Sequence, residues 1–202
     1  MPMTSQSGLG SGADVAERWR EAFLDCAQKS EDRDAIREAA SNEDLKRWTQ
    51  LLTGVVVQSC QSLGWRAAAK GHKLDLLPQA RSEYLGLDVT AFASEPKPHT
   101  PWAFPLAVFE LENSLSDEKV SYCLWKVACI RSPFAVVMAY RKDWSKAVAL
   151  AQGLSEMAPR ELVLNGQSLV LVMGSRSLGE QFPWSFFRFW KYTPTLKAFS
   201  KF

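Results

Sequence analysis

Three acidic residues interrupt stretches of sequence that are otherwise typical of buried strands. Asp88 lies within LGLDVTAF, and Glu110 and Glu112 lie within LAVFELEN. Because side chains alternate along a strand, Glu110 and Glu112 share one face, with their backbones about 6.6 Å apart. A Pro-rich segment, residues 94–101, connects the two stretches. We therefore expect neighbouring strands on which the three carboxylates share a small volume.

Carboxylates placed so closely indicate a metal site. They repel one another and lose hydration, which destabilises a fold unless the charge is compensated. Oxygen-only ligands favour a hard ion such as Mg²⁺, for which Mn²⁺ substitutes. Such an ion is suited to phosphodiester hydrolysis, because it lowers the pKa of the attacking water and stabilises the leaving oxygen. The alternative is structural: acids at strand ends often face water or pair with Arg and Lys.

The elements that must position these acids follow from the hydrophobic period. A helical pattern starts at Asp14, a short charged helix follows, and a longer helix capped near Ser41 ends at Gly64. Tyr84 to Ala93 alternates as one strand. The segment 184–192 is expected to form an edge strand or a final helix. The remaining expected strands cover 65–70, 106–112, 134–140 and 169–173, and the remaining helices cover 116–130 and 143–152.

The order of these elements predicts an α/β fold. A helix that joins two buried strands implies a parallel pair with a right-handed crossover, whereas the first strands, joined by loops, are free to be antiparallel. We expect a mixed central sheet with helices on both faces. Residues 1–12 form a flexible tail, 13–63 a helical part packed on the core, and 64–202 the α/β core, together one compact domain.

The acidic strands and the elements after them resemble the core of the PD-(D/E)xK nuclease superfamily. In that core an acid on one strand precedes acid-x-Lys on the next. The segment LGLDVTAF supplies the first acid, and PLAVFELENS supplies the second, Glu110. The helix SDEKVSYCLWKVACI and the strand FAVVMAY match the next half, so the resemblance spans about residues 65–175. Glu112 stands where the family usually has Lys, which is similar to the ExE variant of some type II restriction endonucleases. The resemblance implies a restriction-endonuclease-like core and a magnesium-dependent endonuclease acting on DNA.

Carried over by position, the resemblance assigns roles to these acids. Asp88 and Glu110 would ligate the metal, with a carbonyl from Leu111, and Glu112 would hold or deprotonate the attacking water. Lys119, in the first turn of the next helix, would supply the missing positive charge, or is an ordinary surface residue. The family often has a further metal-ligating acid from an earlier helix or loop. The candidates are Glu83, Asp75 and Glu43. In a straight strand the side chain of Glu83 would lie on the opposite face from that of Asp88.

The charge of the chain is unevenly distributed. The net charge of 24 − 22 = +2 does not by itself indicate nucleic-acid binding. Residues 183–202, however, carry four basic residues and no acidic residue, interleaved with aromatic residues. These aromatic residues either stack on nucleobases or pack in the core, and we favour packing. The expected nucleic-acid-binding cations are Arg141, Lys142, Lys146, Arg188 and Lys191.

Partners and location follow from the same features. DNA is the expected partner, with RNA left open, and a homodimer is expected because cutting both strands needs two sites. The longest apolar runs have about seven residues, against about 20 for a membrane span, and no signal peptide is recognised, so we expect a cytoplasmic protein without membrane contact. The alternative function is a non-catalytic module that binds nucleic acid or protein and keeps the nuclease fold.

Overall fold

The structure is a computed structural model that describes residues 12–29, 31–74, 84–94, 103–157 and 166–202. Its helices are α1 (Gly12–Lys29), α2 (Arg33–Ser41), α3 (Leu45–Ser62), α4 (Asp117–Ala128) and α5 (Trp144–Met157), with 3₁₀ turns η1 (Tyr84–Gly86) and η2 (Arg176–Gln181). Its strands are β1 (Trp65–Ala69), β2 (Val89–Ala93), β3 (Ala107–Glu112), β4 (Phe134–Arg141), β5 (Ser168–Ser175), β6 (Phe187–Thr193) and β7 (Ala198–Lys201). The tail 1–11 lies outside the described residues, as does most of the Pro-rich connection 94–101.

The strands form one mixed sheet in which spatial order follows chain order. Within the described residues the sheet has seven strands, ordered β1 to β7. The helices α4 and α5 connect β3, β4 and β5, which are parallel, while the strands on either side pair antiparallel. The expected mixed α/β sheet, with parallel strands joined by helices and antiparallel strands before them, is confirmed.

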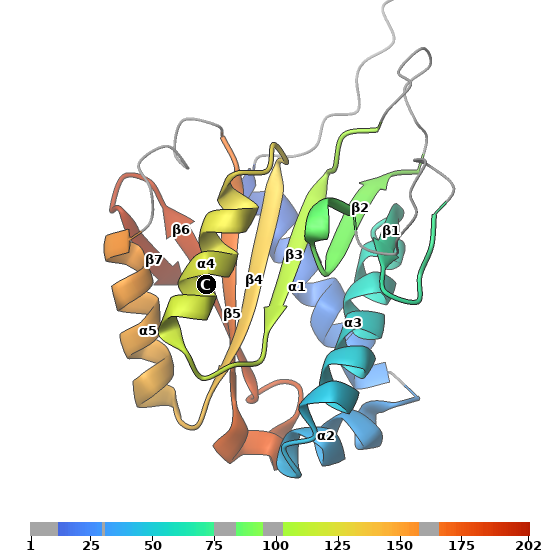
Figure 1. Cartoon of the computed structure of the whole chain (residues 1–202), viewed down its shortest axis with the longest axis vertical. Helices are drawn as coiled ribbons and strands as arrows, with labels where there is room; N and C mark the ends of the chain where they lie inside the picture. The colour runs from blue at the N-terminus through green and yellow to red at the C-terminus, as the bar shows by residue number, and fades with distance from the viewer. Residues whose placement is uncertain (1–11, 30, 75–83, 95–102, 158–165) are drawn as a thin grey trace, which may run out of the picture.

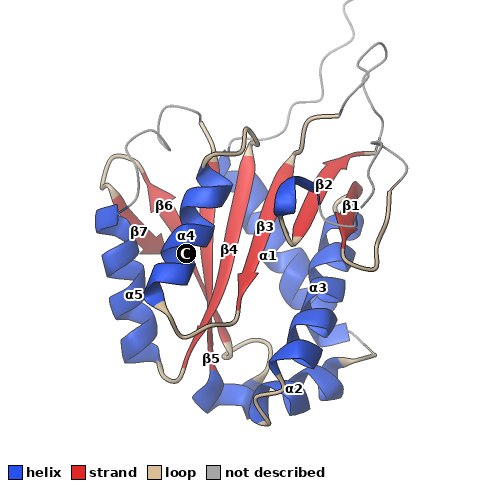
Figure 2. Cartoon of the chain, viewed as in Figure 1, coloured by secondary structure: helices blue, strands red, loops and turns tan. Residues whose placement is uncertain are grey.

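Helices cover both faces of this sheet, as expected (Figures 1 and 2). The side chains of β4 alternate between the two layers: Phe134, Val136 and Met138 pack with α1 and α3, and the intervening residues pack with α4 and α5. Every residue of β4 is buried, which explains its unbroken apolar sequence. None of the helices in the described part of the chain has the length and apolar character needed to cross a bilayer.

Trp19 of α1 packs the N-terminal helices against the central strands. Its indole is fully buried and lies 5.4 Å from the Phe109 ring and 5.7 Å from the Phe134 ring, measured between ring centroids. Its Nε1 donates a hydrogen bond to Ser59 Oγ of α3 at 3.1 Å. One aromatic side chain therefore joins α1, α3 and the central strands.

The expected starts of two elements were wrong. The long helix starts at Leu45 after an Asp44 cap, whose carboxylate accepts from the Arg47 amide, and not near Ser41. The strand expected from Tyr84 begins only at Val89, because Leu85 has φ of +57° and Gly86 has φ of +67°, which turn the chain.

The segment 184–192 is neither a final helix nor an edge strand. Its strand β6 lies between β5 and β7, so both of its edges are at least partly paired. The packing interpretation is confirmed for five of its aromatic residues, which are buried, whereas Trp184 is 58% exposed. The buried residues are Phe186, Phe187, Phe189, Trp190 and Tyr192.

We predict that Gly174→Ala destabilises the protein. A Cβ atom there would lie 2.5 Å from Tyr140 Cδ1 and 2.7 Å from Phe186 Cε1, which is closer than carbon atoms can approach. Because both rings are buried, the cost should be about 1–3 kcal/mol of unfolding free energy, measured by urea denaturation.

Gly153→Ala in α5 is the matched control. No neighbouring heavy atom lies within 4 Å of its added Cβ, so this change should raise stability by about 0.5–1 kcal/mol. Equal effects of the two substitutions would contradict the packing described around Gly174.

Candidate active site

Asp88 and the two glutamates lie where β2 begins and β3 ends. These strands are antiparallel, with Val89 opposite Phe109, so the residue before β2 is next to the last residues of β3 (Figure 1). Asp88 Oδ2 accepts a hydrogen bond from the Leu111 amide at 2.7 Å. The carboxylate thus takes the place of a backbone acceptor and extends the pairing beyond Val89, which holds Asp88 next to Glu110 and Leu111.

Glu110 is a buried acid beneath helix α4. It is 4% exposed, and it points to the α4 side because its neighbours Phe109 and Leu111 pack in the opposite layer. Lys126 Nζ, from the last turn of α4, lies 2.7 Å from Glu110 Oε1. The same ammonium donates to the Gly86 carbonyl at 2.9 Å. Lys126 therefore joins α4, β3 and the η1 turn.

The sequence of α4 explains how Lys126 reaches this position. The Ser116 hydroxyl accepts from the Lys119 amide and starts the helix, which buries Val120, Cys123 and Val127 against the sheet. Residue 126 lies three positions after Cys123, on the edge of this buried face, so its long side chain can run under the helix with its stem in apolar surroundings.

Burial and neighbouring charge set the ionisation of this group. Burial raises the pKa of Glu110 to about 7, the hydrogen bond with Lys126 opposes the rise, and the negative charge of Asp88 adds to it. Burial alone would lower the pKa of Lys126, but its hydrogen bond with Glu110 and the nearby negative charges raise it above its usual value. Asp88 and Glu110 are thus close enough to repel, and Lys126 is a cation near both of them.

Glu112 and Lys119 are placed differently from this group. Glu112 is half-buried, and its Oε1 accepts from the Ser114 amide at 2.6 Å. Lys119 is exposed in the first turn of α4, so it is Lys126 that supplies the positive charge at Glu110. Within the described residues, no three His, Cys, Asp or Glu side chains are grouped to hold a metal ion. The expected cluster of three carboxylates reduces to the pair Asp88 and Glu110.

Of the further acids named from the sequence, the structure describes only Glu43. Glu83 and Asp75 lie outside the described residues. Glu43 precedes α3, where its Oε1 forms an ion pair with Arg176 Nη1 at 3.1 Å. Its carboxylate therefore fixes η2 to the N-terminal helices.

Arg141, expected to contact nucleic acid, is engaged within the protein. It is 4% exposed at the end of β4, and its guanidinium pairs with Asp117 at the start of α4. It also donates to the Tyr140 carbonyl at 2.6 Å and to the Ser114 carbonyl at 3.5 Å. Arg141 thus fixes the β3–α4 connection that follows Glu112.

The other expected nucleic-acid-binding cations do not form one stripe. Lys142 and Lys146 are exposed after β4. Arg188 and Lys191 are three residues apart on β6, so they point to opposite faces of the sheet. Arg188 lies 4.0 Å above the Trp144 ring, measured to the centroid, whereas Lys191 is half-buried and burial lowers its pKa. Binding of nucleic acid by these side chains stays a prediction.

Lys126 is the site residue that sequence reasoning missed. Its signal was a lysine on the flank of the buried face of α4, one helical turn after Cys123. A lysine at such a position is usually solvated, and only the strand beneath the helix shows which acid it meets.

Comparison with known proteins adds only distant structural likeness. No protein-family model and no curated protein matches the chain. Among solved structures, the chain is similar to NucC from P. aeruginosa ATCC27853 and to NucC from E. coli MS115-1, each solved in a cAAA-bound form. The identities are 13% and 14% and the TM-scores 0.46 and 0.40, over 98% of this chain and 85% of each NucC chain.

We predict that Glu110→Gln removes a pH-dependent part of the stability. The folded-state pKa of about 7 lies above the ordinary value of 4.5, so between these values the native chain binds more protons than the unfolded chain. Stability then falls as pH rises through this window, by up to about 3 kcal/mol in total. Urea unfolding at pH 5 and pH 8 should show this loss in the wild type but not in the variant.

The exposed Glu118→Gln is the matched control, since it removes a carboxylate from α4 at the surface. It should keep the wild-type pH dependence. If Glu110→Gln kept it as well, Glu110 would not be the buried titrating group.

Proposed function

We propose that this protein is a metal-dependent endonuclease that hydrolyses DNA phosphodiester bonds. The observation that carries the proposal is the grouping of Asp88 and Glu110 from adjoining strands with Lys126, whose Nζ lies 2.7 Å from Glu110 Oε1. Two carboxylates beside one cation match the need of phosphodiester hydrolysis for a metal-binding pair and a positive charge near the phosphate.

The residues fit a hard divalent cation. Glu110 has a pKa raised to about 7 by burial and by the Asp88 charge, which is a destabilising arrangement that a cation would relieve. Mg²⁺ is commonly held by one or two carboxylates together with substrate phosphate oxygens, so Asp88 and Glu110 suffice as protein ligands. When bound, Mg²⁺ or Mn²⁺ would activate the attacking water and stabilise the leaving oxygen.

The protein side chains would supply orientation and charge. Lys126, held by the Gly86 carbonyl and with a raised pKa, stays protonated and would neutralise the negative charge that builds on the phosphate. In this proposal it takes the place of the lysine that the resemblance leaves absent at position 112. Glu112, held at the end of β3 by the Ser114 amide, would accept the proton of the attacking water.

The proposed site predicts which substitutions abolish cleavage. Plasmid nicking with Mg²⁺ or Mn²⁺ should fall at least about 100-fold in Glu110→Gln, because a neutral amide is a poor ligand for a hard cation. Asp88→Asn should have a similar effect, and its amide oxygen still accepts the Leu111 hydrogen bond, so folding should be kept. Metal-dependent cleavage that survives both substitutions would overturn the site assignment.

The two lysines of α4 give a sharper comparison. Lys126→Met should abolish nicking, whereas Lys119→Met should retain it, because only Lys126 contacts Glu110. Both variants remove one positive charge from the same helix, so a general loss of DNA attraction would affect them alike. Circular dichroism of each variant checks that it is folded. Equal activity of the two variants would assign the positive charge to neither lysine.

The ion pair itself favours a second candidate, a non-catalytic module that binds nucleic acid. Lys126 already compensates Glu110, and within the described residues no group of three potential ligands is present. In that case DNA would be bound without cleavage under every metal condition, with an affinity that falls steeply as salt is raised.

For the nuclease we propose a homodimer, since cutting both strands needs two sites. Light scattering of the purified protein measures its mass.

A further inference from the structure

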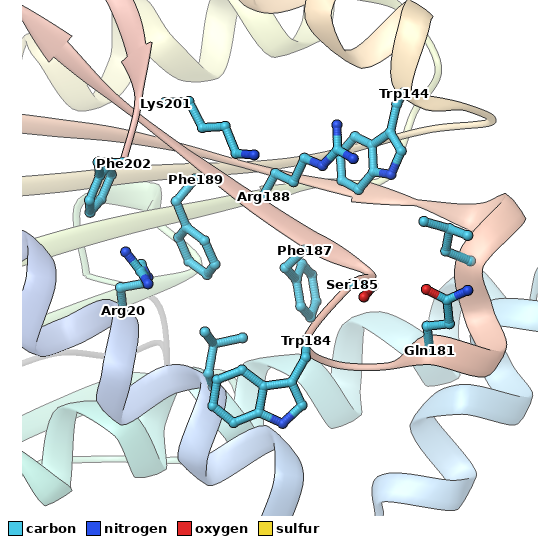
Figure 3. Close-up of a pocket in the computed structure, with 12 residues that line it drawn as sticks. Arg20, Trp144, Gln181, Trp184, Ser185, Phe187, Arg188, Phe189, Lys201 and Phe202 are labelled. Carbon is cyan, nitrogen blue, oxygen red and sulfur yellow. The ribbon is translucent and has the colours of Figure 1, made fainter.

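A groove lies at the β6–β7 end of the sheet, away from the carboxylates of β2 and β3. It follows the part of β6 that β7 does not cover, since β7 pairs only with residues 190–193, and it has a volume of about 420 Å³. Residues from α1, α5, β6 and β7 line it (Figure 3). Two strands, β4 and β5, separate β6 from β3. The groove is therefore separate from the Asp88 and Glu110 group.

The groove is lined by cations without acids. Arg20 from α1, Arg188 from β6 and Lys201 from β7 contribute to it, and no Asp or Glu is found among the described residues that line it. In the described part of the chain, none of the three forms an ion pair with another side chain. Three uncompensated positive charges around one groove attract an anion.

Two of these cations lie close enough to act together. Lys201 pairs with Trp190 in the sheet, and Arg188 is two residues from Trp190 on the same strand, so Arg188 and Lys201 share one face. Such diagonal neighbours are about 7–8 Å apart at the backbone. The two long side chains can therefore reach a single phosphate group.

Aromatic rings form the rest of the groove. Arg20 lies 5.8 Å from the Phe189 centroid and 5.7 Å from the Phe202 centroid, and Arg188 lies 4.0 Å from that of Trp144. Trp184 lines the groove beside α1 and is 58% exposed, so much of a large ring is accessible to a ligand (Figure 3). Such a surface suits a ligand that has both a flat aromatic face and a negative charge.

We propose that this groove binds a nucleotide unit. Its base would stack on Trp184, and its phosphate would lie between Arg188 and Lys201, with Arg20 adding positive charge from α1. A simple anion would leave the aromatic surface unused, and an apolar ligand would leave the cations unpaired. The nucleotide comes either as a free mononucleotide or as part of a single strand. The site goes beyond the proposed nuclease function and does not rest on it.

Binding is tested without divalent cations, so that no cleavage interferes. Binding would be measured by titration in EDTA with two ligands, thymidine monophosphate and a ten-residue oligothymidylate. Trp184→Ala should weaken binding at least about fivefold, because stacking of one base contributes about 1–3 kcal/mol. Lys201→Gln should weaken binding of the strand and lower the slope of log affinity against log salt by about one.

The matched controls are Trp125→Ala and Lys46→Gln, which remove an exposed tryptophan and an exposed lysine away from the groove. Both should bind like the wild type, and thermal unfolding checks the folding of each variant. If the strand binds more than about tenfold tighter than the mononucleotide, single-stranded nucleic acid is the source of the nucleotide. Comparable affinities identify a free nucleotide instead.

The proposal is overturned if neither probe binds, or if Trp184→Ala and Trp125→Ala have the same effect. The outcome is independent of the nuclease test. Loss of nicking in Glu110→Gln with no binding at the groove would support the first site alone. Binding at the groove without any nicking would support the nucleotide site in the groove alone.

Discussion

The contact between Glu110 and Lys126 is the interaction on which the rest of the candidate site depends. A carboxylate with 4% exposure under a helix is costly to bury alone, and its partner Lys126 is itself half-buried. Removing one member of such a pair typically costs about 3–5 kcal/mol, because the other charge is left uncompensated. A buried ion pair adds little net stability compared with apolar packing. Its presence here is more easily explained by function than by folding.

The sheet topology brings the acids together. At β3 the antiparallel part of the sheet meets the parallel part, since β2 runs against β3 while β4 runs with it. The start of one strand and the end of the next therefore lie side by side, with a helix above both. Asp88 is fixed there by accepting the Leu111 amide, a hydrogen bond that a backbone carbonyl would otherwise make. The same contact that continues the sheet also aligns a carboxylate.

Much of the fold could be predicted from the sequence, because hydrophobic period reports directly on burial. The unbroken run at Phe134 predicted a central strand, and acids within apolar strands predicted a buried charge at Glu110. Lys126 could not be found in this way, since its partner is distant in sequence. The hydrogen bond that Glu112 accepts from the Ser114 amide could not be predicted either, because it depends on how the chain turns after β3. The opposite faces of Arg188 and Lys191, by contrast, follow from counting residues along one strand.

Helix α4 is held to the sheet at both ends. Arg141 of β4 forms an ion pair with Asp117 in its first turn. Lys126 in its last turn forms an ion pair with Glu110 and donates a hydrogen bond to the Gly86 carbonyl. These contacts at both ends of α4 restrain the helix on the sheet and so help to fix the position of the Lys126 ammonium. Its outward side, where Tyr122 and Trp125 are exposed, carries no part of that attachment. Substitutions can accumulate there over evolution while the buried chemistry beneath stays unchanged.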